Sequence, residues 1–469
     1  MKKVLLFNPP LYFDKGIPRA LDVSVPPLGL LYLASYLNKH AGKEIRAAVV
    51  DIAVGGLTLK DIGRLVKRKK PFIIGITSMT PQLQGAVELA SFLKRSISPK
   101  LKIFLGGSHI SADPNFVSRF GDIFDYGITG EAEKTFMESA EKLSRGQKIP
   151  KIQTGEVIMN LDTIPFPDKK LINREKYNQR ESMMFSRGCP YQCYYCSRPA
   201  ISKRVRYRSA NNMIEEIKSV YKYCNGKIDF QDDTFNLNKA KVLEFCAAAQ
   251  REKLKLEWRC NARIDLMDKE LLYAMKSAGC SLVHFGIEAG NEKVRSEIVK
   301  KGNFTNKKIY EIFEMCKRFK IKIAGYFMIG HPGETKKQVE DTKKMILDSN
   351  IDLLGLSIPT PFPGSNLYRI AKKEGIINEE IIDKFALKEL GEGYTGNYPV
   401  FVPKGMTKDY LFSVMKEINR RFYINFKTFR KRILEDITSF KKLKQDASDL
   451  LCLILRGVST RKPYVKKKQ

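Results

Sequence analysis

The chain has 469 residues, of which 43% are hydrophobic and 10% aromatic, so it can form several packed domains and is not a disordered protein. Its longest apolar runs fall well short of the ~18–20 residues that cross a bilayer, and its N-terminus lacks a secretory signal pattern. We therefore expect a cytoplasmic protein that can also sit peripherally at a membrane. The net charge of +32 implies attraction to phosphates of nucleic acid, anionic lipid or substrate without choosing among them, and a generally basic proteome would give the same number.

Residues 1–150 alternate strand-like and helix-like segments. This alternation predicts an α/β domain of βαβ units around a doubly wound parallel sheet. Ligands of such sheets bind beyond the carboxyl ends of the strands. The candidate binding residues at these ends are Asn8, Thr77, Ser78, Gly106, Gly107, His109, Gly130 and Glu131. Ordinary turn chemistry explains the same residues, and their spacing alone favours that explanation.

Residues 151–182 contain a proline-rich stretch at 164–168 and are predicted to be a linker. Strand–helix alternation then resumes over 183–375, where six βα units follow one another. Strands are expected at 183–186, 229–231, 256–260, 282–287, 323–329 and 353–358. Because a full eightfold barrel typically needs ~250 residues, we predict a partial (β/α)6 barrel, with its active site at the carboxyl ends of the strands.

Residues 376–469 are predicted to be a basic, mostly helical C-terminal region. From Phe401 onward there are 18 Lys and Arg against 6 Asp and Glu, and aromatic residues alternate with the basic ones. Such a pattern is typical of a helix at an anionic membrane surface, of a polyanion-binding helix, or of a plain solvated face. The sequence does not decide among these three.

The nine cysteines are distributed unevenly: none lies in residues 1–188, and three fall within eight residues, Cys189, Cys193 and Cys196. An odd number in a reducing compartment argues against a disulfide framework, and the singly placed cysteines are expected in the core. Three soft thiolates with C-x3-C-x2-C spacing can hold three corners of an iron–sulfur cube and leave one iron open. A structural zinc ion is the alternative, but it needs four ligands and no histidine lies nearby in the sequence.

A strand, this cysteine spacing with aromatic Tyr195 before the third cysteine, and a six-unit barrel together resemble the radical S-adenosylmethionine superfamily. The stretches 229–235, 258–263, 286–290 and 325–334 look like the same superfamily. The N-terminal domain, with Asn8-Pro9-Pro10, Pro26-Pro27-Leu28-Gly29-Leu30 and Gly106-Gly107-Ser108-His109, is similar to the flavodoxin-like cobalamin-binding domain of one large branch. The resemblance covers about residues 1–375.

The resemblance implies three cofactors: a [4Fe–4S] cluster, S-adenosylmethionine and cobalamin. In the family, the cluster gives one electron to S-adenosylmethionine, and the resulting 5′-deoxyadenosyl radical abstracts hydrogen from an unactivated carbon. By motif match, Cys189, Cys193 and Cys196 hold the cluster. The residues implied for S-adenosylmethionine are Asp232 and Asp233 at the amine, Arg263 at the carboxylate, Glu288 at the ribose, the Gly330 loop at the adenine, and Tyr195 beside the cluster.

These roles have structural alternatives. Asp232 and Asp233 are also expected to act as a helix N-cap, and Arg263 and Glu288 to form a mutual or neighbouring salt bridge at the barrel rim. The Asp-x-His-x-x-Gly element that supplies a cobalt-binding histidine in many cobalamin domains is absent. Cobalamin would therefore bind without an imidazole below the cobalt, with His109 as a contact candidate only, and a domain that binds no cobalamin stays open.

The resemblance implies methyl transfer to an unactivated carbon of a small or amphiphilic, lipid- or tetrapyrrole-like substrate, with flavodoxin or ferredoxin as electron donor. The alternative is a cobalamin-dependent oxidative cyclisation or rearrangement. An RNA-modifying enzyme would suit the positive charge. However, the methylthiolating relatives carry a second cysteine triad in the N-terminal domain, and residues 1–188 contain no cysteine, so we do not expect a nucleic-acid substrate. A non-catalytic cobalamin or redox sensor is a third class, against which the intact triad argues.

Overall fold

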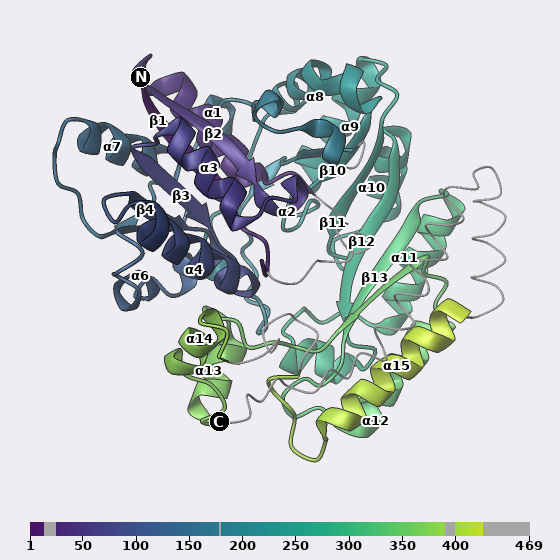
Figure 1. The fold of residues 1–469 in the computed structure, drawn as a ribbon. Coiled ribbons are helices and arrows are strands. Elements are labelled where there is room, and N and C mark those ends of the chain that lie inside the picture. Colours follow the sequence, from purple (N-terminus) through teal and green to yellow (C-terminus); the bar gives the residue numbers. More distant parts are fainter. Residues whose placement is uncertain (14–24, 178–179, 390–398, 425–469) are drawn as a thin grey trace.

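The computed structural model describes residues 1–13, 25–177, 180–389 and 399–424, and Figure 1 shows two parallel sheets, each with its own helices. The first sheet has the order β2-β1-β3-β4-β5-β6 with every neighbouring pair parallel. Its strands are β1 (Lys2–Asn8), β2 (Ile45–Asp51), β3 (Ile73–Thr77), β4 (Lys102–Gly106), β5 (Tyr126–Thr129) and β6 (Ile152–Thr154). The first five follow the flavodoxin-type order, so the predicted doubly wound sheet is confirmed.

Alternate residues of the central strands pack on opposite faces of this sheet. On β1, Val4 and Leu6 join the core under α1 (Leu28–His40) and α7 (Glu133–Ser144). Leu5 and Phe7 join the core under α3 (Leu59–Lys69) and α4 (Leu83–Phe92). A strand buried on both faces reads as a continuous apolar run, as residues 4–7 do. The remaining helices of this domain are short: α2 (Ile52–Gly55), α5 (Ser108–Ala112) and α6 (Phe116–Arg119).

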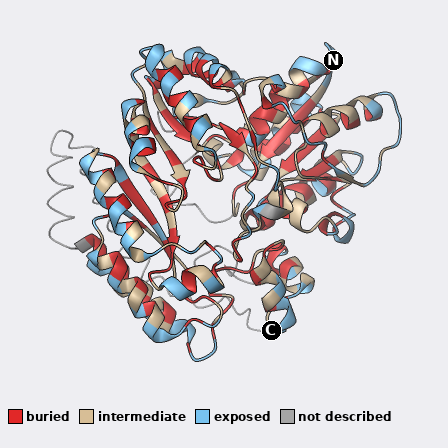
Figure 2. Ribbon diagram, turned by 180° about the vertical axis from the view of Figure 1, so that it is seen from behind, coloured by how far each residue is buried: buried red, intermediate tan, exposed pale blue. Residues whose placement is uncertain are grey.

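The second sheet has the order β14-β13-β12-β11-β10-β7, again with parallel neighbours. Its strands are β7 (Glu181–Met183), β10 (Lys227–Phe230), β11 (Glu257–Ala262), β12 (Cys280–Glu288), β13 (Lys322–Met328) and β14 (Leu353–Ser357). In the described part of the chain, β7 and β14 lie at the two edges rather than pairing with each other, so the predicted partial six-stranded barrel is confirmed. Figure 2 shows buried residues concentrated along the strands of both sheets.

The helices of the barrel begin where the sequence places a capping residue. They are α8 (Ala210–Cys224), α9 (Lys239–Arg251), α10 (Lys269–Ser277), α11 (Asn306–Arg318) and α12 (Lys336–Asp348), and α13 (Asn366–Lys373) follows the last strand and packs into a core of the first domain. In each case the side chain before the first residue accepts a hydrogen bond from the first turn; these caps are Ser209, Asn238, Asp268, Thr305, Thr335 and Ser365. Such caps satisfy backbone donors that a helix leaves free.

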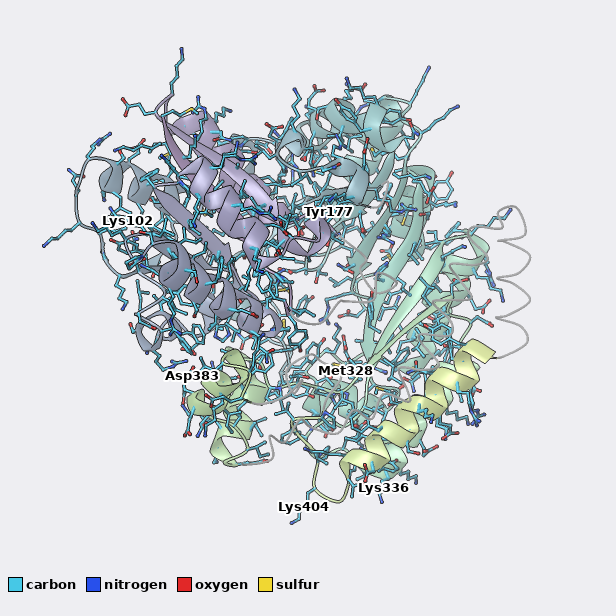
Figure 3. The ribbon with its side chains drawn as sticks, viewed as in Figure 1. Lys102, Tyr177, Met328, Lys336, Asp383 and Lys404 are labelled. Carbon is cyan, nitrogen blue, oxygen red and sulfur yellow. The ribbon has the colours of Figure 1, made fainter. Side chains whose placement is uncertain are left out.

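The segment 151–182, predicted to be a linker, is more ordered than a linker. It contributes β6 to the first sheet, and Leu161 and Ile164 pack against Leu28 and Tyr32 of α1. The Tyr177 hydroxyl, labelled in Figure 3, donates to Asp51 at the end of β2 over 2.8 Å. A three-residue strand between Lys and Gly is too short to show the alternation from which strands are predicted.

The described part of the C-terminal region contains the helices α14 (Glu379–Ala386) and α15 (Lys408–Ile424). Phe422 and Tyr423, which belong to the predicted basic and aromatic surface, are instead buried, and the Tyr423 hydroxyl donates to the Leu354 carbonyl of β14. Their aromatic character therefore serves packing against the barrel. The remainder of the basic tail, 425–469, lies outside the described residues. Within the described ranges, no helix combines the length and the apolar character needed to span a membrane.

Candidate cofactor site between the two sheets

The three cysteines lie on one loop between the short paired strands β8 (Ser186–Arg187) and β9 (Arg206–Tyr207). Gly188 starts this loop with φ of 93°, and a Cβ there would collide with the Arg204 carbonyl, so the turn needs glycine. The backbone N–H of Cys189 donates to the Ser202 carbonyl over 3.3 Å, and that of Cys196 donates to the Cys193 carbonyl over 2.9 Å. The hairpin and these bonds fix the loop that presents the thiols.

The thiols are partly or wholly buried. Burial raises the pKa of the Cys193 thiol and raises that of Cys196 to about 11. Because metals bind thiolates, loading this loop releases protons. Within the described ranges, no three His, Cys, Asp or Glu side chains converge on a single metal-ion position. An iron–sulfur cube takes one thiolate at each corner, which three thiols on one loop can supply, whereas a zinc ion needs four ligands around one point.

Tyr194, within the cysteine loop, is tied to the loop that follows β13. Its hydroxyl lies 2.7 Å from Nδ1 of His331, and Nε2 of His331 lies 3.2 Å from the Met328 carbonyl. Since a carbonyl only accepts, Nε2 carries the proton and the tyrosine donates to Nδ1. Burial lowers the pKa of His331 to about 4, so the imidazole is neutral. The prediction from the sequence includes Gly330 of this loop but not His331 beside it.

Gly330 and His331 are held by a buried carboxylate. Oε2 of Glu334 accepts from both backbone N–H groups, over 2.7 and 2.9 Å. Burial raises the pKa of Glu334 to about 7 in spite of these bonds. Gly330 has φ of 89°, and Leu411 of α15 lies against it. The predicted adenine loop is therefore shaped by its own carboxylate and backed by a helix near the C-terminal end of the described chain.

Glu288 and Arg263 each have an internal partner. Glu288, at the end of β12 with φ of 71°, forms a 3.0 Å ion pair with Lys301, and the pair leaves no room for a Cβ on Gly286. Arg263 forms a two-pronged pair with Asp265 at 2.7 and 3.0 Å and lies 3.6 Å above the Tyr191 ring. The neighbouring-salt-bridge alternative is thus confirmed, but the partners are not each other. Sequence reasoning missed Lys301, which carries no motif of its own.

Asp232 and Asp233 have different surroundings. Asp232 is fully buried and accepts from the N–H groups of Phe185 and Ser186, which lead into the cysteine loop; burial raises its pKa to about 6. Asp233 pairs with Arg198 over 2.7 Å beside the third cysteine. The N-cap alternative is wrong for both, because the cap of α9 is Asn238. Asp232 therefore orders the strand before the cluster loop, and Asp233 the chain after it.

A cavity lies between the carboxyl ends of the first sheet and the cluster loop. Its lining includes Thr77, Gly106, Gly107, Gly130 and Glu131 from the first domain and Arg187, Gly188, Arg198, Gln231 and Asp233 from the barrel. Its lining also includes the apolar side chains of Leu30, Leu33, Phe104 and Phe136. A Cβ on Gly29 would meet nothing within 4 Å, and one on Gly106 would meet only the Ile128 carbonyl at 3.9 Å. At these two positions the absence of a side chain leaves space in the cavity.

Three other candidates of the first domain lie outside this lining. The Asn8 side chain accepts from Gln82 over 3.1 Å, and the Ser78 hydroxyl donates to the Met79 carbonyl. His109 is buried, with Nδ1 3.0 Å from the Thr80 hydroxyl, and burial lowers its pKa to about 4. The left-handed backbone of Gly107 starts α5 here and directs the histidine into the core beside Phe116. His109 therefore lies outside the lining of the cavity, and its contact with cobalamin stays a prediction.

The observed donors fit an iron–sulfur cube next to a large, partly apolar cofactor. Three thiols on one loop, glycines in the lining of the cavity and the apolar side chains beside them match these two groups in chemistry. The same cavity is bordered by Gly188, next to Cys189, and by Gly130, at the end of β5. The geometry therefore defines the class of protein that holds a metal cluster and a second cofactor beside one cavity.

Comparison with known proteins agrees with this geometry. Family models match the radical SAM superfamily over residues 183–346 and the B12 binding domain over residues 17–140. The chain is 31% identical over 453 residues to an uncharacterised methyltransferase of Pyrococcus horikoshii, with 92% of this chain and 95% of that protein covered. It is 26% identical to the anaerobic magnesium-protoporphyrin IX monomethyl ester cyclase of Rubrivivax gelatinosus, with 90% and 77% covered.

A solved structure of the radical S-adenosylmethionine methyltransferase TsrM from Kitasatospora setae, with cobalamin and a [4Fe–4S] cluster bound, superposes with a TM-score of 0.65 at 20% identity, covering 81% of this chain and 79% of that one. The chain belongs to the radical S-adenosylmethionine superfamily, in the branch of cobalamin-dependent methyltransferases. It is an enzyme, and its cofactors are a [4Fe–4S] cluster, S-adenosylmethionine and cobalamin.

Replacing Gly29 by leucine tests the cavity. A Cβ at this position meets nothing within 4 Å, and Gly29 lines the cavity, so we expect the longer side chain to occupy part of that space. We expect the melting temperature to be unchanged or higher, because glycine disfavours helix, while the Kd for hydroxocobalamin in equilibrium dialysis rises at least about tenfold. Lys39→Leu, at an exposed position of the same helix, is the control and should bind normally. Normal cobalamin binding by Gly29→Leu would contradict this assignment of the cavity.

Glu334→Gln tests the buried carboxylate. The pKa of Glu334 is about 7 in the folded state against an ordinary value of 4.5, so the folded protein holds the proton longer than the unfolded one. Wild-type stability therefore falls as pH rises from about 4.5 through 7, and the neutral variant escapes this loss. In chemical denaturation, the free energy of unfolding of the variant should rise by about 1–3 kcal/mol relative to that of wild type between pH 5 and 8. Glu340→Gln, at an exposed position of α12, should show no such gain; a pH-independent difference for Glu334→Gln would refute the buried, protonated state.

Proposed function

We propose that this enzyme methylates an unactivated carbon of a small or amphiphilic, lipid- or tetrapyrrole-like substrate. The proposal depends on one observation above the others: a single cavity is lined by the glycine-rich strand ends of the B12-binding domain and by Gly188 and Arg198 of the cluster loop. Two cofactors that share a cavity can act on one substrate without releasing an intermediate to water. The apolar side chains of the lining favour a substrate with a hydrophobic body.

The residues of the chain have separate tasks in this proposal. When bound, the cluster supplies the electron that splits S-adenosylmethionine and cobalamin supplies the methyl group. Cys189, Cys193 and Cys196 hold the cluster, and Asp233, Glu288 and the Gly330 loop bind S-adenosylmethionine. Thr77, Gly106, Gly107 and Gly130 provide the surface for cobalamin. Arg263 and Asp232 shape the site through their buried contacts with Tyr191 and with the strand before the cysteines. A flavodoxin or ferredoxin is the proposed electron donor.

The second candidate function is an oxidative cyclisation or rearrangement with the same cofactors. The likeness to a magnesium-protoporphyrin cyclase over 90% of this chain favours keeping it. The two candidates differ in stoichiometry, because methyl transfer consumes a second S-adenosylmethionine to remethylate cobalt and cyclisation does not. An RNA substrate is not proposed, since residues 1–188 contain no cysteine for a second cluster.

Anaerobic reconstitution with iron, sulfide and hydroxocobalamin, followed by reductant and methyl-deuterated S-adenosylmethionine, distinguishes the two. We expect both 5′-deoxyadenosine and S-adenosylhomocysteine by mass spectrometry, with labelled methyl on cobalamin. Cys193→Ala should reduce 5′-deoxyadenosine at least about a hundredfold, because one corner of the cluster loses its ligand. The buried Cys224→Ala in α8 is the matched control. Formation of 5′-deoxyadenosine without S-adenosylhomocysteine or labelled cobalamin would favour cyclisation or rearrangement.

We also propose that the basic tail draws the enzyme to anionic membranes, where an amphiphilic substrate resides. The tail from residue 425 holds most of the positive charge of the C-terminal region, and each basic residue near an anionic surface adds ~1 kcal/mol. Deleting residues 425–469 should abolish sedimentation with phosphatidylglycerol vesicles at low salt and leave the weak binding to phosphatidylcholine unchanged. Equal sedimentation of the full and shortened chains would exclude a membrane role for the tail.

A further inference from the structure

Arg187 joins the cluster loop to the B12-binding domain. It is the last residue of β8, two positions before Cys189. Its guanidinium places Nη1 3.0 Å from Oε2 of Glu131 and Nη2 2.7 Å from Oε1 of Glu133. The same guanidinium lies 5.0 Å from the ring centre of Tyr32 on α1. One side chain of the barrel thus contacts two carboxylates and an aromatic ring of the other domain.

The two carboxylates lie where cobalamin is expected. Glu131 follows Gly130 directly at the end of β5, and Glu133 is the first residue of α7. Arg206 of β9 also pairs with Glu131 and donates to the Ile158 carbonyl over 2.6 Å. Both strands of the hairpin that presents the cysteines therefore hold the same turn of the B12-binding domain. Glu131, Glu133 and Arg187 all line the cavity.

The bridge is buried and charged. Only 12% of the Arg187 side chain is exposed, against 9% for Glu131 and 8% for Glu133. Burial by itself would lower the pKa of Arg187, but Glu133 and Glu131 raise it above its usual range. Burial would raise the pKa of Glu131, yet Arg206 and Arg187 hold it below its usual range. Such a node keeps its geometry, because moving one charge leaves another without a partner in a poorly solvated space.

We propose that Arg187 is a positioning residue that couples the two cofactor sites: it fixes the cluster loop against the cobalamin-binding turn, so that each cofactor binds more tightly when the other is present. The proposal rests on the proposed function only in that both use this cavity. A planar guanidinium bridges two carboxylates, whereas the single ammonium of lysine cannot do so with the same geometry. Thermodynamic linkage requires the effect to be equal in both directions.

A second arginine provides a matched control. Arg119, at the end of α6, contacts Asp113 over 2.7 Å and Asp383 of α14 over 2.7 Å. It therefore also bridges two carboxylates and joins the first domain to another part of the chain. Figure 3 labels Asp383 on α14, beneath α4 and α6. This bridge does not contribute to the lining of the cavity given above.

The test is the ratio of hydroxocobalamin affinities with and without the cluster. Full-length protein is prepared anaerobically in both forms, and Kd is measured by equilibrium dialysis. For wild type and for Arg119→Lys we expect the cluster-loaded form to bind about tenfold more tightly. For Arg187→Lys the ratio should fall to within about twofold of one. A general loss of stability changes both affinities together and leaves the ratio unchanged, so the ratio reports coupling and not folding.

The outcomes separate this inference from the proposed function. If wild type binds no cobalamin in either form, the proposed function fails; if it binds with a ratio of one, only the coupling fails. If Arg187→Lys does not take up the cluster, Glu133→Gln is measured in its place. This variant removes one contact of Arg187 from the side of the B12-binding domain and leaves the cluster loop unaltered. We expect its ratio of hydroxocobalamin affinities with and without the cluster to fall as well. A ratio in Glu133→Gln or Arg187→Lys that equals the wild-type ratio overturns the role of Arg187.

Discussion

Parallel strands impose one constraint from which the rest of this structure follows: all their carboxyl ends emerge at one edge, where the following loops gather. The chain contains two such edges, one in each sheet, and they face the same cavity. Neither edge alone would bring thiols and a glycine-lined surface together. The hairpin of β8 and β9 is the element that crosses between them, with Arg187 and Arg206 turned toward the first domain and the cysteines toward the barrel.

The fold could be predicted because strand–helix alternation is a local pattern that tertiary packing reinforces. Strand order, the open barrel and the main helices match the structure, since the central strands of the first sheet are apolar runs and each barrel helix starts at a capping residue. The prediction did not include β6, because a strand of three residues is too short to show an alternation of apolar and polar side chains. The tail shows the opposite failure: Phe422 and Tyr423 have the composition of a surface motif but are packed against β14, and composition does not reveal a neighbour far along the chain.

One short motif places the three candidate cluster ligands on one loop, whereas the sequence says much less about side chains that act in pairs. Lys301 beside Glu288, Asp265 beside Arg263, and Glu131 beside Arg187 are pairs of charges that only the folded chain brings together. A buried charge must have a partner, so the sequence indicates that partners exist without saying which residues they are. His109 shows the same limit, because the sequence offers it as a contact candidate without indicating that its side chain lies beside Thr80 and Phe116.

The contact between Leu411 and Gly330 has a consequence for how the enzyme matures. The loop expected to receive adenine is backed by α15, a helix that the ribosome makes after all six barrel strands. A nascent chain can complete both sheets and present its cysteines before that support exists. A chain interrupted before α15 would therefore lack the side chain that packs on Gly330, so the loop expected to receive adenine gains its last support late in synthesis.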